Sequence, residues 1–145
     1  MDKDKRILEI LKQNSKLTTS QISKKTNIPI TTVHNRIKKM EKSGLIISYS
    51  VVLDYKKAGR PIAAYILVNI VYALPSGKKI QQEDVAKSIK KLGNVEEVSI
   101  IAGGADILVK VRVKDVEELN DFVVKKLRSI DGVDKTQTMI ILSSV

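Results

Sequence analysis

The sequence has no cysteine and only one histidine, and these shortages narrow the kinds of site that it can build. Without cysteine, disulfides and thiolate metal ligands are excluded. A single histidine cannot form a multi-histidine metal site or a catalytic pair of histidines. Aromatic residues make up 3% of the chain, which excludes base-stacking platforms as the main way of binding nucleic acid. We therefore expect no metal and no cofactor.

Long apolar runs are also missing. No run reaches the roughly 18 residues that a membrane span needs, and the apolar stretch Ile62–Tyr72 is interrupted by Asn69. The N-terminal residues MDKDKR lack the apolar core of a signal peptide. We therefore expect a cytoplasmic protein with no membrane partner.

Charge is distributed unevenly along the chain. Residues 1–60 hold 14 Lys/Arg against 5 Asp/Glu, a net charge of +9, whereas residues 61–145 hold 12 against 11, a net charge of +1. Positive charge confined to the first segment indicates a polyanionic partner for that segment. The change in charge also indicates a domain boundary near residue 60, and 145 residues suffice for one or two small domains.

The stretch Thr18–Leu45 has the pattern of two helices joined by a tight turn. Thr18 and Gln21, three residues later, form a capping-box pattern. Asn27 tolerates the left-handed conformation that ends a helix, and Pro29 suits the first turn of the next one. With the preceding segment, the pattern predicts helices over residues 2–13, 18–26 and 29–43.

The last of these helices has the composition of a DNA-reading helix. Its apolar residues recur at helical spacing, at Ile30, Val33, Ile37 and Met40. The remaining faces carry hydroxyls, amides and cations, which suit base edges and phosphates in the major groove of double-stranded DNA. The candidate DNA-binding residues are Thr31, Thr32, His34, Asn35, Arg36, Lys38, Lys39 and Lys42.

Simpler interpretations of this helix stay open. An ordinary helical hairpin with a solvated basic face shows the same pattern. His34 could be a solvated surface residue. Arg36 lies about 60° from the apolar stripe, so it could brace the domain instead of touching DNA.

An extended segment follows the helices. In IISYSVVLD, Ile47, Tyr49, Val51 and Leu53 alternate with smaller or polar residues, which predicts a strand with one buried face. Three helices and this strand make residues 1–53 a winged helix-turn-helix domain. Residues 54–61 (DYKKAGRP) carry turn residues and charge, and we interpret them as a linker.

Residues 62–145 predict the order βαββαβ. The expected strands and helices cover residues 62–72, 82–92, 95–102, 106–113, 115–127 and 133–142. The segment KKLGNVEEV (90–98) aligns without gaps to KKLRSIDGV (125–133), which indicates two repeated halves. The pattern predicts an α+β fold overall, with a ferredoxin-like second domain that has both helices on one sheet face. The first strand should be buried on both faces. The open face keeps Leu108 and much of Ile62–Tyr72, which predicts a second copy of the chain as its partner.

Four segments invite comparison with a known family: TVHNRIKKMEKSGLI (Thr32–Ile46), VVLD (Val51–Asp54), GGADILVKVRVKD (Gly103–Asp115) and TQTMIIL (Thr136–Leu142). In this order, they resemble the leucine-responsive/asparagine-regulator (Lrp/AsnC, feast/famine) family of transcription regulators. The resemblance implies a winged helix-turn-helix that binds double-stranded DNA. It also implies a second domain that forms dimers, tetramers or octamers and binds an amino acid or a related metabolite. Asn27, Pro29 and Ile30 depart from the family pattern, which leaves the start of the recognition helix open.

The resemblance also implies an effector pocket between dimers, lined by a glycine turn, the following Asp and the last strand. These positions correspond to Gly103, Gly104, Asp106, Thr136 and Thr138. Glycines let backbone groups approach a ligand, and a carboxylate suits an α-ammonium group. The alternative is an ordinary hairpin turn at Gly103–Gly104, with Asp106 as its hydrogen-bonding partner.

Two other classes of function compete with DNA binding. Ferredoxin-like folds also bind RNA, but such sheets usually carry aromatic residues on their central strands, and residues 95–102 and 106–113 have none. An enzyme, or the metabolite-sensing subunit of one, is the other alternative. The paired carboxylates lie at expected helix starts and turns, where capping and solvation explain them. With no nucleophile–base pattern visible, we expect the protein not to be an enzyme.

Overall fold

A computed structural model describes residues 2–145, in two compact units. The first unit ends at Val52 and the second begins at Leu53. Residues 54–61, expected to be a linker, group with the second unit. None of the helices in residues 2–145 is long and apolar enough to cross a membrane.

The first unit is built from three helices, α1 (Lys3–Gln13), α2 (Thr19–Thr26) and α3 (Ile30–Lys42). They meet in a core that contains the fully buried side chains of Ile7, Ile22 and Val33. The helix-turn-helix prediction is thus confirmed, and α3 begins at Ile30 with Pro29 as its N-cap.

Local side-chain chemistry sets the ends of α2 as predicted. The Thr18 N–H donates to Gln21 Oε1 at 2.9 Å, and the Gln21 N–H donates to Thr18 Oγ1 at 3.2 Å, which completes the capping box. Asn27 ends the helix in the left-handed conformation with φ 55°. This reversal directs the chain into α3.

Two expectations for the first unit are wrong. Ile30 is 49% exposed, because it stands at the first position of α3, where the core no longer covers it. The strand expected over Ile47–Leu53 does not form, and Ile47 and Val51 are 92% and 77% exposed. A strand needs a neighbouring strand to hydrogen-bond, and across the described residues none pairs with this segment.

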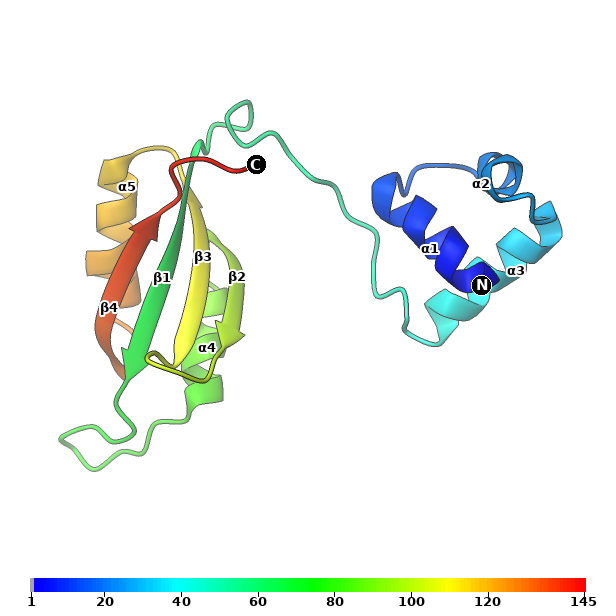
Figure 1. The fold of residues 1–145 in the computed structure, drawn as a ribbon. Coiled ribbons are helices and arrows are strands. Elements are labelled where there is room, and N and C mark those ends of the chain that lie inside the picture. Colours follow the sequence, from blue (N-terminus) through cyan, green and yellow to red (C-terminus); the bar gives the residue numbers. More distant parts are fainter. Residues whose placement is uncertain (1) are drawn as a thin grey trace. The chain divides into compact units, whose positions relative to one another are not determined.

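The second unit is a four-stranded antiparallel sheet in the order β2-β3-β1-β4, with two helices on one face (Figure 1). This is the predicted ferredoxin-like arrangement. The last helix begins as an α-helix and widens into a π-helix, which sequence spacing does not predict. The elements are β1 (Ile62–Ile70), α4 (Gln82–Lys90), β2 (Val95–Ile100), β3 (Ile107–Val113), α5 (Val116–Asp121), the π-helix η1 (Phe122–Leu127) and β4 (Val133–Ile140).

The two sheet faces differ in cover. On the helix side, Ile66 and Val109 pair across β1 and β3 and are fully buried with Phe122. On the other side, Leu67 and Leu108 pair directly and are only partly buried. The expectation that β1 is buried on both faces is therefore wrong for the single chain. We refer to this second side, which no helix of the second unit covers, as the open face.

Candidate nucleic-acid interface and effector site

Helix α3 presents most of the candidate DNA-binding side chains to solvent. Thr32 and Arg36 are partly buried, whereas the others are exposed. The exposed set is Thr31, His34, Asn35, Lys38, Lys39 and Lys42. Val33 and Met40, on the opposite side of the helix, are buried and fix how α3 is rotated on α1 and α2. The helix thus exposes a continuous row of donors, acceptors and cations.

The turn before α3 is held by polar side chains that sequence patterns did not single out. Thr26, only 2% exposed, donates from Oγ1 to the Ile22 carbonyl at 2.7 Å and accepts the Ile28 N–H at 3.3 Å. Ser23 Oγ donates to the Ile28 carbonyl, and the Arg6 guanidinium donates to the Thr26 carbonyl. The sequence feature that could have pointed to them is Thr26, a threonine at a helix end where the apolar spacing expects a buried residue. These bonds fix the angle at which α3 leaves α2.

Arg36 is engaged inside the domain. Its Nη1 lies 3.4 Å from Asp4 Oδ1, and the two side chains are 38% and 24% exposed. The contact joins α3 to α1, which is the bracing role that its angle from the apolar stripe allowed. Lys38 differs, because its ion pair with Glu41 at 3.8 Å is weak and exposed.

Glu41 also binds the segment that follows α3. Tyr49 Oη donates to Glu41 Oε1 at 2.9 Å. Burial, followed by this hydrogen bond and the carboxylate charge, raises the pKa of Tyr49 above its ordinary value of 10.0. The bond ties the start of the exposed segment to the end of the candidate recognition helix.

The glycine turn lies between β2 and β3 in the second unit. Gly103 has φ +142°, a conformation that side chains rarely adopt. Gly104 is not in this region, and a Cβ built there would meet nothing within 4 Å. The fold of the single chain therefore accounts for glycine at position 103 and does not account for it at position 104.

Asp106 organises the polar contacts around this turn. Its Oδ2 accepts the Ile70 N–H at 2.9 Å, and its Oδ1 accepts the Tyr72 hydroxyl at 3.1 Å. Asn69 Nδ2 donates to the Gly104 carbonyl at 3.0 Å, and Gln82 Nε2 donates to the Asp106 carbonyl at 2.9 Å. Asn69, Tyr72 and Gln82 were not predicted, because strand and helix periodicity cannot show that β1, α4 and the glycine turn meet at one end of the sheet.

Tyr72 is the exposed member of this group. Its hydrogen bond to Asp106, with smaller contributions from burial and the carboxylate charge, raises the pKa of Tyr72 above 10.0. Each Asp106 oxygen keeps a further lone pair after these bonds. The carboxylate can therefore accept a ligand's ammonium group while it holds the turn in place.

The two threonines lie elsewhere in the single chain. Thr136 pairs with Val68 and Thr138 with Ile66, so β1 separates both from β3 and its glycine turn. Two strand spacings amount to about 10 Å. Because their β1 partners point into the core, both threonines belong to the helix side of the sheet, where Thr136 is partly buried and Thr138 exposed. One chain alone does not bring the five predicted effector residues together.

Comparison with protein families assigns both units. Residues 2–47 match a model described as winged helix-turn-helix DNA-binding. Residues 66–145 match the Lrp/AsnC ligand binding domain, which covers more than half of the chain. The two matches cover the helices of the first unit and most of the sheet of the second.

Relatives that match nearly the whole chain support the same assignment. An HTH-type transcriptional regulator of Pyrococcus furiosus is 42% identical over 137 residues, covering 94% of this chain and 89% of the relative. The HTH-type transcriptional regulator FL11 of the same organism is 37% identical, covering 97% and 88%.

Solved structures share the fold over the full chain. A transcriptional regulator of Neisseria meningitidis, solved as its L-Met complex, has a TM-score of 0.89 and 27% identity, covering 100% of this chain and 92% of that one. LrpC of B. subtilis has a TM-score of 0.84 and 27% identity, covering 100% and 96%. Together with the family matches, these relatives show that the chain belongs to the Lrp/AsnC family of HTH-type transcriptional regulators.

Proposed function

We propose that the protein is a dimer that binds a pseudo-palindromic site in duplex DNA through the exposed face of α3. The observation that carries this proposal is the row of hydroxyl, amide and cationic side chains on α3, with no carboxylate before Glu41. Asn35 can form paired hydrogen bonds with a base edge, and Lys38, Lys39 and Lys42 are placed for phosphates. Arg36 acts through the position of α3, since Asp4 holds it.

The open face of the sheet supports self-association. Leu67 and Leu108 lie opposite each other at its centre, and Met139, opposite Tyr65, is 41% exposed. A second copy would cover these apolar side chains symmetrically. Assembly of such dimers into tetramers or octamers would bring glycine turns and β4 edges of different chains within reach of one another.

The effector that we propose is an amino acid, bound where the glycine turn meets another chain. Asp106 would hold the α-ammonium group, and Gly104 would allow close approach of the ligand. Thr136 and Thr138, being distant within one chain, would contribute from a neighbouring copy. The L-Met complex of the Neisseria meningitidis relative supports an amino acid as the effector.

RNA binding remains the second candidate because one central strand of the sheet carries an aromatic residue. The sheet's central strands are β1 and β3, and β1 carries Tyr65, with Lys110 Nζ 5.6 Å from its ring centroid. Residues 95–102 and 106–113, which lack aromatic residues, hold β2 and β3, and of these two strands only β3 is central. One tyrosine still falls short of the two or three stacking residues that such sheets use. We propose no enzymatic role and a cytoplasmic location, where the DNA partner would be.

Selection from a pool of random duplexes tests the DNA proposal. We expect an enriched site with two-fold symmetry, whose half-sites lie about one helical turn apart or a multiple of it. An enriched pool without two-fold symmetry would contradict the proposal that the protein binds DNA as a dimer. Better competition by single-stranded RNA than by duplex DNA would favour the second candidate.

The effector proposal has a test with a matched control. Gly104→Ala should keep the fold, because a Cβ meets nothing within 4 Å, and should weaken L-methionine binding in calorimetry at least several-fold. Gly93→Ala adds the same methyl group at an equally open position away from the turn, and should bind as the wild type does. Equal binding by both variants would remove Gly104 from the site.

A further inference from the structure

Residues 54–60 form a closed turn. Asp54 Oδ1 accepts the N–H groups of Lys56 and Lys57 at 3.1 and 3.3 Å, and the Asp54 carbonyl accepts the Ala58 N–H at 3.0 Å. The Arg60 N–H donates to the Tyr55 carbonyl at 2.8 Å. A segment that composition predicts to be a free linker is thus folded on itself.

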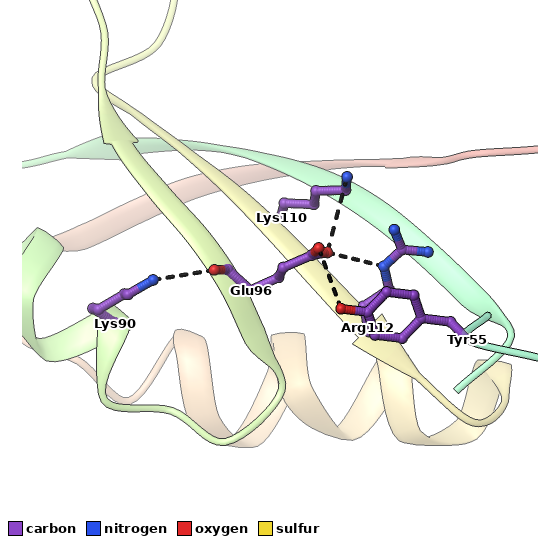
Figure 2. A network of polar contacts seen from close by, with 5 residues as sticks. All are labelled: Tyr55, Lys90, Glu96, Lys110 and Arg112. Carbon is purple, nitrogen blue, oxygen red and sulfur yellow. Dashed lines mark hydrogen bonds and ion pairs between the residues drawn. The ribbon is translucent and has the colours of Figure 1, made fainter. Parts of the chain in front are cut away.

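Tyr55 fastens this turn to the sheet. The centroid of its ring lies 4.0 Å from the guanidinium carbon of Arg112, and its hydroxyl donates to Glu96 Oε1 at 3.5 Å (Figure 2). Arg112 Nε in turn donates to Glu96 Oε2 at 2.9 Å. We call these three residues, Tyr55, Glu96 and Arg112, the Tyr55 clamp. The side chains of Arg112 and Glu96 are 22% and 31% exposed, so their contacts are partly shielded from water.

The clamp is itself well supported. Lys110 Nζ lies 3.9 Å from Glu96 Oε2, and Lys90 Nζ donates to the Glu96 carbonyl at 3.1 Å (Figure 2). The β2–β3 register shifts between Val95 and Glu97, an irregularity of the kind that re-aims a side chain. Glu96 is therefore held from β3 and from the end of α4.

A second tyrosine holds the other end of the connection. Tyr49 is bonded to Glu41 of α3, as described above. Between the two tyrosines, residues 50–53 take part in no hydrogen bond of the described chain. A chain from Tyr49 to Tyr55 spans at most about 20 Å, whereas one from Tyr49 to Pro61 reaches about 40 Å.

We infer that the Tyr55 clamp sets the spacing of DNA half-sites that the dimer accepts, by fixing where the tether of each DNA-binding unit begins. The inference rests on the proposed dimeric DNA binding and adds to it a residue, Tyr55, that determines specificity without touching DNA. With the clamp closed, the tether is short and only a narrow range of spacings can be reached. With the clamp open, only the turn's own hydrogen bonds hold residues 54–60. When these break, the tether reaches about twice as far and the constraint on spacing weakens.

Duplexes that carry the selected half-sites at changed spacings test this inference in the full-length protein. For the wild type, we expect affinity to fall at least about tenfold when about 5 base pairs, half a helical turn, are inserted. For Tyr55→Ala, the same insertion should cost less than about threefold, with the protein still dimeric in sedimentation. Tyr55→Phe keeps the ring on Arg112 and should resemble the wild type.

Trypsin digestion tests, in the absence of DNA, whether the clamp holds the turn closed. Lys56 and Lys57 lie in the turn and are exposed cleavage sites, whereas the bond after Arg60 precedes Pro61 and resists trypsin. Cleavage there should be several-fold faster in Tyr55→Ala than in the wild type or in Tyr55→Phe.

The outcomes separate the two proposals. A dimeric Tyr55→Ala variant with the spacing profile of the wild type would overturn the clamp inference and leave the proposed function standing. Unchanged trypsin cleavage would likewise overturn it. A wild type that selects no two-fold site would overturn the proposed function and this inference together.

Discussion

Asn35 and Lys38 lie one turn of α3 apart or less, are both exposed, and should have different effects on DNA binding. We expect Asn35→Ala to relax sequence preference at one base pair per half-site and to cost about 1–3 kcal/mol, because an amide can bond a base edge bidentately. Lys38→Ala should weaken binding to all duplexes alike and reduce the dependence on salt, because an ammonium mainly meets phosphate. Titration against specific and random duplexes at several salt concentrations measures both effects.

A control for this pair lies in the second unit. Lys125 is exposed and, within residues 2–145, pairs only with Asp121 four residues earlier, so Lys125→Ala removes the same charge without touching α3. It should bind DNA nearly as the wild type does. A Lys38→Ala variant that selects a new sequence at unchanged affinity would contradict the phosphate role.

Tyr72 gives a residue-level prediction about pH. Its pKa in the folded protein is raised above 10.0, chiefly by the hydrogen bond to Asp106. The stability that this bond contributes is therefore present in full below about pH 10 and is lost as pH rises through the folded-state pKa. In an ultraviolet titration, Asp106→Asn should lower the pKa of Tyr72. Tyr72→Phe identifies which step belongs to this residue, and an unchanged titration curve in Asp106→Asn would argue against the assignment.

Among the elements, those with local signals could be predicted well from sequence. The capping box of α2 and the left-handed Asn27 follow from neighbouring residues alone, and both are present. The strand at Ile47–Leu53 was predicted from alternation, yet alternation shows only that a strand could form. A strand also needs a neighbour, which the pattern cannot supply. The π-helix was missed because its wider turn still buries Phe122, Val123 and Leu127, at intervals close to those of an α-helix.

The turn between η1 and β4 provides a prediction about stability. Gly132 has φ +96°, and a Cβ there would lie 2.5 Å from Ile80 Cγ2 and 3.2 Å from Val85 Cγ2. Gly132→Ala should lower the free energy of unfolding by about 2–4 kcal/mol, through backbone strain and overpacking together. Urea unfolding measures the loss.

Gly77 provides the matched control. Its φ of +88° is similar, but a Cβ there would meet nothing within 4 Å. Gly77→Ala should therefore cost only the strain, about 1 kcal/mol. Equal losses in the two variants would show that the contacts of Gly132 with Ile80 and Val85 play no part.

At the scale of the whole molecule, sequence patterns predicted the two units and their topology, since uneven charge, the βαββαβ order and the internal repeat are properties of long segments. These patterns could not predict which positions meet, because that depends on the register between strands. The apolar run of β1 did not show which side chains face the helices, and only pairing with β3 places Leu67 beside Leu108. The distance of Thr136 and Thr138 from the glycine turn likewise follows from β1 lying between β3 and β4.

The last prediction concerns the open face. A fragment that begins at Leu53 contains the whole second unit, including the Tyr55 clamp, and should fold alone and sediment as a dimer or larger. Leu67→Asp or Leu108→Asp would place an unpaired charge at the centre of the interface, at a cost of several kcal/mol, and should give monomers. In the full-length protein, either change should also abolish tight DNA binding, because a single helix-turn-helix loses the second half-site.

Val116→Asp separates this effect from a general intolerance of added charge. Val116 is 61% exposed at the start of α5, on the helix side of the sheet, so its substitution should leave the fragment associated. A wild-type fragment that sediments as a clean monomer at micromolar concentration would refute the proposed interface. The pairing of Leu67 with Leu108 would then have to be explained by a partner other than a second copy, because two leucines at the centre of an uncovered sheet face lose their hydrophobic stabilisation when they stay in water.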